Sequence, residues 1–304
     1  MLNNERKYNM KGIILCFSAY VLLTLSIGNA GQDSCDELIQ KSEQLWMENK
    51  YDESDKCLDK VLKLCPKLAD PYWRKARNEF ERLEALPRDQ KPDKEILMER
   101  YLALEALGTK CIELDEKNGS CWFWKGVGIG RYGTTRGVLR SLFLADDVEG
   151  AWLKTESLKP RYYSSDGRSH AMGDCYHALG MFYRLVPEWL CYFPFNWLIG
   201  ACGDKAKSIE YQRKAVALIP KRIQYQRGLA VSLICYGQAY EKPEAVEEGK
   251  KILKELQSLP ELRPFDKIDK AHARMILEDP SLACGYQRDA QHELSQEAYK
   301  KNSK

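Results

Sequence analysis

Apolar residues recur at helical spacing along most of this chain, and no run alternates apolar and polar residues over enough length to predict a strand. The periodic segments predict a first helical hairpin over residues 34–47 and 52–64, with its turn at Asn49. Pro71 lies near the start of the next predicted helix, and proline suits a first turn. The pattern therefore predicts an all-α fold.

One predicted helix carries a more specific pattern. Tyr176, Leu179, Gly180 and Tyr183 form the motif Y-x2-LG-x2-Y, the first-helix signature of a tetratricopeptide hairpin with Tyr in place of Trp. Gly180 has no side chain, so a partner helix can lie close to it. A matching second helix follows later in the sequence. Its repeat positions are Ser208, Gln212, Ala215 and Pro220.

The same second-helix spacing recurs at irregular intervals. Its copies end at positions 66, 116, 160, 220 and 260, so the chain is not a regular array. Each match alone is weak, because amphipathic helices often show this spacing, but their order along one chain is stronger. We therefore expect tetratricopeptide-like helical hairpins over residues 31–284, followed by a polar C-terminal tail over residues 285–304. The alternative is an irregular helical domain without a superhelix.

Two segments exceed what a plain repeat needs. Residues 138–144 carry apolar side chains at i, i+3 and i+4, which predicts an extra helix over the repeat groove. The second insert, between Pro187 and Gly203, holds five aromatic residues. They are Trp189, Tyr192, Phe193, Phe195 and Trp197. Because packed aromatics bury a large area, we expect this insert to be a lid or a partner patch that closes over the groove near Trp122 and Tyr176; core filling is the alternative.

The N-terminal residues 1–30 have the features of a signal peptide. Charged residues precede an apolar run from Gly12 to Ile27, and small residues follow at Gly28 and Ala30. The apolar run is short for a transmembrane helix, although an uncleaved anchor is the alternative. We expect an exported protein, periplasmic or secreted. Its mature form has a net charge near +1, which gives no electrostatic case for binding nucleic acid or an anionic membrane.

Ten cysteines follow the signal segment, an even and high number that favours disulfides in an oxidising compartment. A hairpin turn at Asn49 would place Cys35 opposite Cys65, and a turn over residues 115–120 would bring Cys111 near Cys121. A third predicted pair, Cys191 and Cys202, would tie the aromatic insert. For the three cysteines in mid-helix, buried free thiols are an equal alternative. They are Cys57, Cys175 and Cys235.

Catalytic chemistry has little support in the sequence. His170, Asp174 and His177 share one helical face and could form a metal or acid–base site, but they also fit a helix start with solvated imidazoles. HExxH, CxxC, GxSxG and P-loop motifs are absent. The segment Gly126–Gly130 lies within a predicted helix. A phosphate-binding loop would instead follow a strand, so this segment is not a candidate for one. The sequence therefore favours a non-enzymatic protein with no cofactor and no metal.

Aromatic and basic residues are the better candidates for binding. Trp122, Trp124, Tyr132 and Tyr176 are expected to line the groove. Arg131, Arg136 and Arg140 could bind a carboxylate or phosphate, although a solvated helix face is the favoured interpretation of Arg136 and Arg140. Four aromatic residues of the insert complete the predicted ligand-binding set. They are Trp189, Phe193, Phe195 and Trp197.

Residues 121–220 resemble one family, the T-component of TRAP transporters. The resemblance rests on CWFWKGVGIGRYGTTRGVLRSLFL, YYSSDG, YHALGMFYRLVP and GDKAKSIEYQRKAVALIP. It implies an exported protein of tetratricopeptide-like hairpins with a hydrophobic groove or pore, working beside a periplasmic substrate-binding protein. The long aromatic insert and the high cysteine content depart from that pattern. The helices are also similar to the regulator of microtubule dynamics family, which an export signal and ten cysteines fit poorly.

These observations predict an exported binding module that holds an apolar or amphipathic ligand, or a partner protein, in its groove. A periplasmic substrate-binding protein is one candidate partner, and an oligomer is compatible with the sequence. The alternative is a secreted or periplasmic protein–protein scaffold without a small ligand. A hydrolase or metal enzyme using His170, Asp174 and His177 is a more distant option.

Overall fold

The computed structural model describes residues 34–86 and 90–287 of the chain. Helices account for the regular structure of these residues, where the single extended pairing is an antiparallel bridge between Tyr163 and His170. The all-α prediction is confirmed. The predicted signal peptide over residues 1–30 and most of the predicted polar tail lie outside the described residues. No helix in the described ranges is both long and apolar enough to cross a membrane.

The chain forms two compact units, the first ending at Pro71 and the second beginning at Tyr72. In the first unit, a helix over residues 34–47 and α2 (Tyr51–Leu64) form the predicted hairpin. The hydroxyl of Ser54 donates to the carbonyl oxygen of Ser42 across the hairpin at 2.8 Å. A disulfide between Cys35 and Cys65 joins the two open ends.

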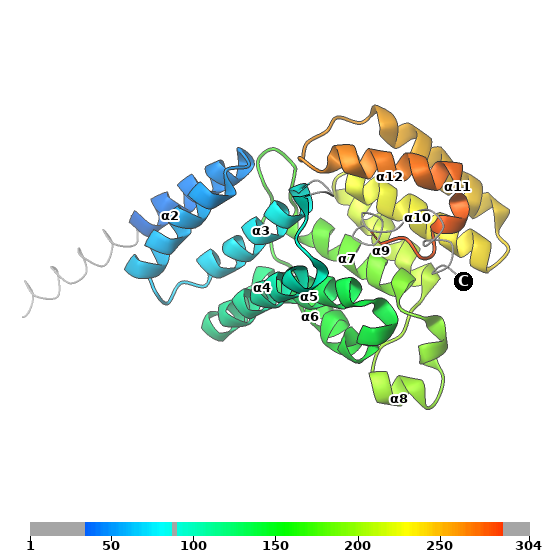
Figure 1. Cartoon of the computed structure of the whole chain (residues 1–304), viewed down its shortest axis with the longest axis horizontal. Coiled ribbons are helices and arrows are strands. Elements are labelled where there is room, and N and C mark those ends of the chain that lie inside the picture. The colour runs from blue at the N-terminus through cyan, green and yellow to red at the C-terminus, as the bar shows by residue number, and fades with distance from the viewer. Residues whose placement is uncertain (1–33, 87–89, 288–304) are drawn as a thin grey trace, which may run out of the picture. The chain divides into compact units, whose positions relative to one another are not determined.

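The second unit contains the remaining helices, most of them paired as hairpins (Figure 1). In chain order they are α3 (Asp70–Ala85, which begins at the unit boundary), α4 (Lys94–Leu114), α5 (Gly119–Arg136), η2 (Val138–Leu144), α6 (Ala145–Leu158), α7 (Ala171–Leu185), η3 (Glu188–Cys191), α8 (Phe195–Ile199), α9 (Lys205–Leu218), α10 (Ile223–Ala239), α11 (Pro243–Glu255), η4 (Leu256–Ser258), α12 (Asp266–Glu278) and η5 (Pro280–Leu282).

Glycines allow α4, α5 and α6 to lie close together. A Cβ added at Gly128 of α5 would come within 2.5 Å of the backbone nitrogen of Glu105 on α4. A Cβ added at Gly126 would meet the indole of Trp152 on α6 at the same distance. The glycine-rich segment Gly126–Gly130 is therefore a packing surface in the middle of a helix, as the sequence predicted, and has no phosphate-loop geometry.

The tetratricopeptide signature pairs α7 with α9. The hydroxyl of Ser208 donates to the carbonyl oxygen of Gly180 at 2.6 Å, and Nε2 of Gln212 donates to the carbonyl oxygen of His177 at 3.1 Å. The Gln212 side chain occupies the space that a Cβ at Gly180 would need. The motif residues of the two predicted helices thus contact one another across the long insert that separates them in sequence.

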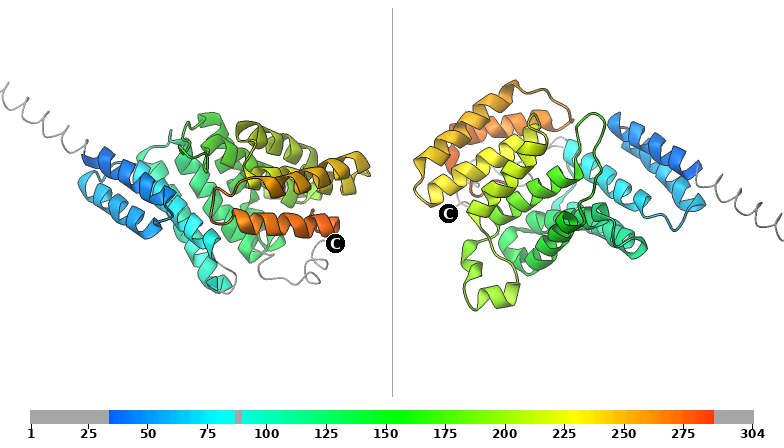
Figure 2. Two further views of the ribbon diagram at one scale, coloured as in Figure 1. Left: turned by 90° about the horizontal axis from the view of Figure 1, so that it is seen from above. Right: turned by 180° about the vertical axis from the view of Figure 1, so that it is seen from behind.

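The helices α10, α11 and α12 lie side by side at the C-terminal end of the second unit (Figure 2). Their core includes Ile234, Leu253 and Ile276, all fully buried. A disulfide between Cys235 and Cys284 closes this region, so Cys235 is not the free thiol that the sequence allowed.

The folded part of the chain extends into the predicted tail. Tyr286 is 3% exposed, and Arg184 of α7 donates to its carbonyl oxygen at 2.8 Å.

The two other predicted cysteine pairs, Cys111–Cys121 and Cys191–Cys202, are also at bonding distance. Cys111–Cys121 joins α4 and α5 across the turn between them, and Cys191–Cys202 closes the aromatic insert around α8. Cys57 and Cys175 are free and buried, which is the alternative that the sequence left open for them.

Candidate functional site

A cavity of about 170 Å³ lies between α5, η2, α6 and α7. Most of its wall is apolar and is contributed by these four elements. The apolar residues that line it include Phe123, Trp124, Val127, Val138, Leu142, Val148, Trp152, Met181, Phe182 and Val186. A hollow of this size with a mainly apolar wall and a few buried polar groups is a candidate ligand site.

The indole of Trp152 on α6 forms part of the apolar wall. It packs on Gly126 and Gly130 of α5, and its Nε1 donates to the carbonyl oxygen of Phe123 at 3.3 Å. The ring of Phe182 on α7 meets it edge to face at 6.4 Å between centroids. Because the indole N–H already has a partner, Trp152 presents a dry wall to the cavity.

The segment over residues 138–144 differs from its prediction. It forms the short 3-10 helix η2 and not a longer α-helix packed by a single apolar face. Val138 and Leu142 line the cavity, whereas Leu139 and Phe143 are exposed. In a 3-10 helix residues repeat every three positions, so the i, i+3, i+4 set cannot share one face.

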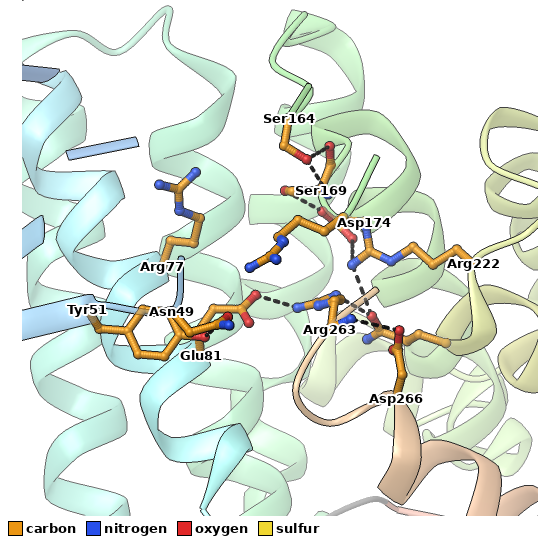
Figure 3. Close-up of polar contacts among 12 residues, drawn as sticks. Asn49, Tyr51, Arg77, Glu81, Ser164, Ser169, Asp174, Arg222, Arg263 and Asp266 are labelled. Carbon is orange, nitrogen blue, oxygen red and sulfur yellow. Dashed lines mark hydrogen bonds and ion pairs between the residues drawn. The ribbon is translucent and has the colours of Figure 1, made fainter. Parts of the chain in front are cut away.

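One end of the cavity is polar and buried. Here Arg131 pairs with Glu84. Arg263 pairs with Glu81 (Figure 3). Arg227, which also lines the cavity, pairs with Asp269 at the helix α12. Each of these arginines therefore has an acidic partner. Burial raises the pKa of Glu81, while the nearby guanidinium groups act in the opposite direction.

Asp174 joins this polar end to the start of α7. Its carboxylate pairs with Arg222 at 2.9 Å (Figure 3). It also accepts a hydrogen bond from the hydroxyl of Tyr225 at 2.8 Å. His170 is the N-cap of α7, where its Nδ1 accepts from the backbone N–H of Gly173 at 3.2 Å. Both side chains thus have structural partners, and Asp174 is not a free base.

His177 is the unusual polar residue of the cavity wall. It is 3% exposed, and its Nδ1 lies 2.9 Å from Oε1 of Gln212. An amide oxygen only accepts, so Nδ1 carries the proton and Nε2 keeps a free lone pair. Within the described residues Nε2 is buried and has no hydrogen-bond partner. Burial lowers the pKa of His177 to about 4, so the ring is neutral at neutral pH.

The structure separates the residues that the sequence grouped as a groove. Trp124 and Arg131 line the cavity. Trp122 lies outside it, with Nε1 donating to the carbonyl oxygen of Glu116 at 2.8 Å. Tyr176 packs against Tyr211 of α9, also away from the cavity.

Two further predicted residues also lie elsewhere. Tyr132 packs on the small core formed by Leu83, Leu97 and Tyr101. The guanidinium of Arg136 lies over the ring of Phe143, 5.3 Å from its centroid. Of the residues predicted to line the groove, Trp122, Tyr132 and Tyr176 therefore do not line this cavity, because residues near one another on a helix point to different neighbours.

The aromatic insert does not cover the cavity. Its helix α8 packs against η2 and η3 and lies at the far end of a projecting segment (Figure 1). None of Trp189, Phe193, Phe195 and Trp197 lines the cavity, and all four are exposed. The expected closure near Trp122 and Tyr176 therefore does not occur, and the insert is a surface feature.

Chemical groups for catalysis are poorly placed. No group of three or more His, Cys, Asp or Glu residues in the described ranges has metal-binding geometry. Burial raises the pKa of the Cys175 thiol, which keeps it protonated and unreactive. The distant option built on His170, Asp174 and His177 loses its geometric basis, because each residue is held by a different structural partner.

The polar end of the cavity was missed at the level of sequence. Glu81, Arg227 and Arg263 come from α3, α10 and the segment before α12, and no local spacing connects them. Trp152 could have been found from the sequence, because it occupies the central, large position of the second-helix spacing Val148-x3-Trp152-x2-Thr155. The wall could thus be anticipated in part, whereas the polar end depends on the packing of distant helices.

No family model matches the chain, and a search of curated proteins finds no match either. Among solved structures, the chain is similar to a thermophilic TPR protein from Thermus thermophilus. The two share 13% sequence identity with a TM-score of 0.51, over 79% of this chain and 99% of the other. At this identity the likeness concerns the fold alone. Together with the helical hairpins described above, it establishes a tetratricopeptide-like all-α fold.

Proposed function

We propose that this chain is an exported, non-enzymatic binding module that holds a small and mainly apolar ligand in the cavity between α5, η2, α6 and α7. The observation that carries the proposal is the mainly apolar lining of this cavity, which includes His177, a residue whose Nε2 is buried without a hydrogen-bond partner among the residues that the structure describes. A buried acceptor without a hydrogen bond costs free energy, and a ligand with one donor group would remove that cost.

The charges around the cavity narrow the class of ligand. Three acidic residues (Glu81, Glu84, Asp174) and three arginines (Arg131, Arg227, Arg263) line it. Each of these arginines contacts a carboxyl group of the protein, so donors of its guanidinium are already occupied. A carboxylate or phosphate ligand would have to displace these partners, and an uncharged ligand with an aromatic or aliphatic body fits better.

We base the proposed cellular role, handling of an apolar compound for transport, on the resemblance to the T-component of TRAP transporters. In that role the module would work beside a periplasmic substrate-binding protein and take an apolar compound from it or pass one to it. The four disulfides within the described ranges support an oxidising compartment such as the periplasm, where such bonds persist. The signal segment over residues 1–30 fits the same location.

A second candidate function is a protein–protein scaffold without a small ligand. The exposed aromatic insert favours it, because large exposed apolar patches mark interaction sites. In this case the cavity would be a packing defect without a ligand.

Binding of indole distinguishes the two functions. Indole has one N–H donor on an apolar body, and a cavity of about 150 Å³ is large enough for a benzene-sized molecule. At an indole concentration ten times its Kd, we expect a stabilisation of about 1.4 kcal/mol and a rise in Tm of a few degrees. Met181→Trp, which places a larger side chain in the cavity wall, should abolish this shift.

Leu153→Trp is the matched control, because Leu153 is a partly exposed residue of α6 that does not line the cavity. It should keep the indole response. An equal Tm shift in the Met181→Trp and wild-type proteins would place binding elsewhere and contradict the proposal. The absence of any shift with indole, toluene and naphthalene would favour the scaffold.

A further inference from the structure

The aromatic insert is the most exposed apolar segment of the described chain. Phe193 is 83% exposed, Trp197 81% and Tyr192 72%, and Leu198 beside them is 69% exposed. Trp189 and Phe195 are less exposed and meet edge to face at 4.8 Å between centroids. Single exposed apolar residues need no explanation, but a cluster of this kind marks an interaction surface.

The insert is held in place at its base. The disulfide Cys191–Cys202 closes it, and Leu190 and Ala201 beside the two cysteines are buried. Just before the insert, Glu188 accepts hydrogen bonds from Lys205 at 2.6 Å and from the hydroxyl of Tyr240 at 2.6 Å. Because the base is fixed, the aromatic side chains are presented to solvent without the entropic cost of ordering a free loop.

The insert itself carries no charge, and side chains of both signs lie beside it, among them Asp146, whose carboxyl group lies against Gly200. From Trp189 to Gly203 the sequence contains no charged residue. The helix α8 packs on η2, whose Leu139 and Phe143 extend the exposed apolar surface. Arg136 and Arg140 flank these two residues, and neither makes an ion pair within the described residues.

We propose that this surface docks on the interface of a lipid bilayer that contains anionic lipids. Trp and Tyr favour the headgroup level of a membrane, and Phe and Leu favour the acyl boundary below it. The uncharged tip could enter that boundary without burying a charge. Arg136 and Arg140 would remain at the headgroups, where each basic residue near an anionic surface contributes about 1 kcal/mol.

The geometry favours lipid over a protein groove or a second copy. A protein partner would have to offer a pocket that matches these rings, whereas a bilayer accepts them without one. The described surface here has exposed rings on a projecting segment that ends in α8 (Figures 1 and 2). The small pocket at the base of the insert is lined by Asn196, Gly200 and Lys207 among others, and none of the exposed aromatics contributes to it. The surface is also separate from the cavity, so this inference does not depend on the proposed ligand.

Co-sedimentation of the exported protein with large unilamellar vesicles tests the docking. Vesicles of phosphatidylethanolamine and phosphatidylglycerol should bind the protein, with a blue shift of tryptophan emission and quenching by brominated acyl chains. The double variant Phe193→Ser and Trp197→Ser should lower the partition coefficient by at least about tenfold, since two large apolar side chains no longer leave water. Both residues are exposed, so the variant should keep the wild-type Tm.

The matched control removes two exposed apolar residues elsewhere, Leu64→Ser and Tyr163→Ser. It should bind vesicles as the wild type does. Arg136→Gln with Arg140→Gln should weaken binding to anionic vesicles by several-fold and leave any binding to pure phosphatidylcholine unchanged. Equal binding of the Phe193→Ser/Trp197→Ser variant and the wild type would overturn the proposal. Concentration-dependent dimerisation that this variant abolishes, without vesicle binding, would overturn it in favour of a second copy.

Discussion

The cavity wall and the aromatic insert are built from the same kinds of side chain but have opposite relations to water. In the wall, Trp152 and Phe182 are buried. In the insert, Phe193 and Trp197 expose more than four-fifths of their surface. If hydrophobicity alone decided burial, all four side chains would be buried. The difference lies in the backbone that carries them.

The wall residues belong to long helices that pack on neighbouring helices. Gly126 and Gly130 let the indole of Trp152 lie against α5, so burial follows from helix contact. The insert interrupts the α7–α9 hairpin, whose own core is complete without it, since Ser208 and Gln212 already bond to α7. The core of this hairpin is already filled, so the aromatic side chains of the insert remain at the surface.

The largest contrast should appear on removing one tryptophan from each region. Trp152→Ala should lower the free energy of unfolding by about 3–5 kcal/mol, because it removes a packed indole and leaves a larger cavity. Trp197→Ala is the matched variant and should change it far less. Urea denaturation followed by circular dichroism measures both. Equal losses would mean that the insert belongs to the core.

Overpacking the wall should have the next largest effect. Gly126→Leu places a side chain where the Trp152 ring now lies and should cost about 1–3 kcal/mol. Gly150→Leu on α6 is the control, because no atom lies within 4 Å of a Cβ at that position. Differential scanning calorimetry of the two variants would measure this contrast. Similar Tm values would show that α5 and α6 are not held together at Gly126.

The cavity should also make stability depend on pH. In the unfolded chain His177 takes up a proton below about pH 6.5, whereas burial holds its pKa at about 4 in the fold. The unfolded state therefore binds more protons between these values, and the free energy of unfolding falls as the pH drops from about 6.5 to 4. The slope from this residue approaches about 1.4 kcal/mol per pH unit. Chemical denaturation at several pH values measures it.

His177→Gln is the variant that isolates this contribution. Glutamine does not titrate and can still bond to Gln212. The free energy of unfolding of the His177→Gln variant should depend less on pH over the same interval, even if its value is lower than that of the wild type at every pH. An unchanged slope would show that carboxylates elsewhere dominate the pH dependence.

The smallest effect is expected at the tip of the insert. Phe193→Ala should change the free energy of unfolding by no more than about 0.5 kcal/mol, because the ring is 83% exposed. Hydrogen exchange in α7 and α9 should be unchanged. A loss above about 2 kcal/mol would mean that the tip packs against the rest of the chain in solution.

Much of the fold could be predicted because its signals are local. The spacing of Tyr176, Leu179 and Gly180 marks a helix that needs a close partner, and Gln212 supplies the contact. The Cys35–Cys65 and Cys111–Cys121 pairs follow from where a hairpin turns, since equal arms bring the two ends together. The helical class and the hairpins were thus determined by residues near one another in sequence.

The site could be predicted only in part. Trp124 and Arg131 were expected and do line the cavity, while Trp122 and Tyr176 were expected and do not. The direction of a side chain on a helix depends on which neighbour its face meets, and periodicity does not state which neighbour that is.

The sequence by itself determined the all-α class, the hairpin signature and the turns that bring cysteines together, because each depends on spacing within one or two helices. Only the tertiary structure decided where the cavity lies, that Nε2 of His177 has no partner among the described residues, and that the aromatic insert faces outward. Each of these depends on contacts between segments far apart in the chain, such as α3 with the segment before α12 through Glu81 and Arg263. Burial is a property of the assembled unit, and no single segment carries it.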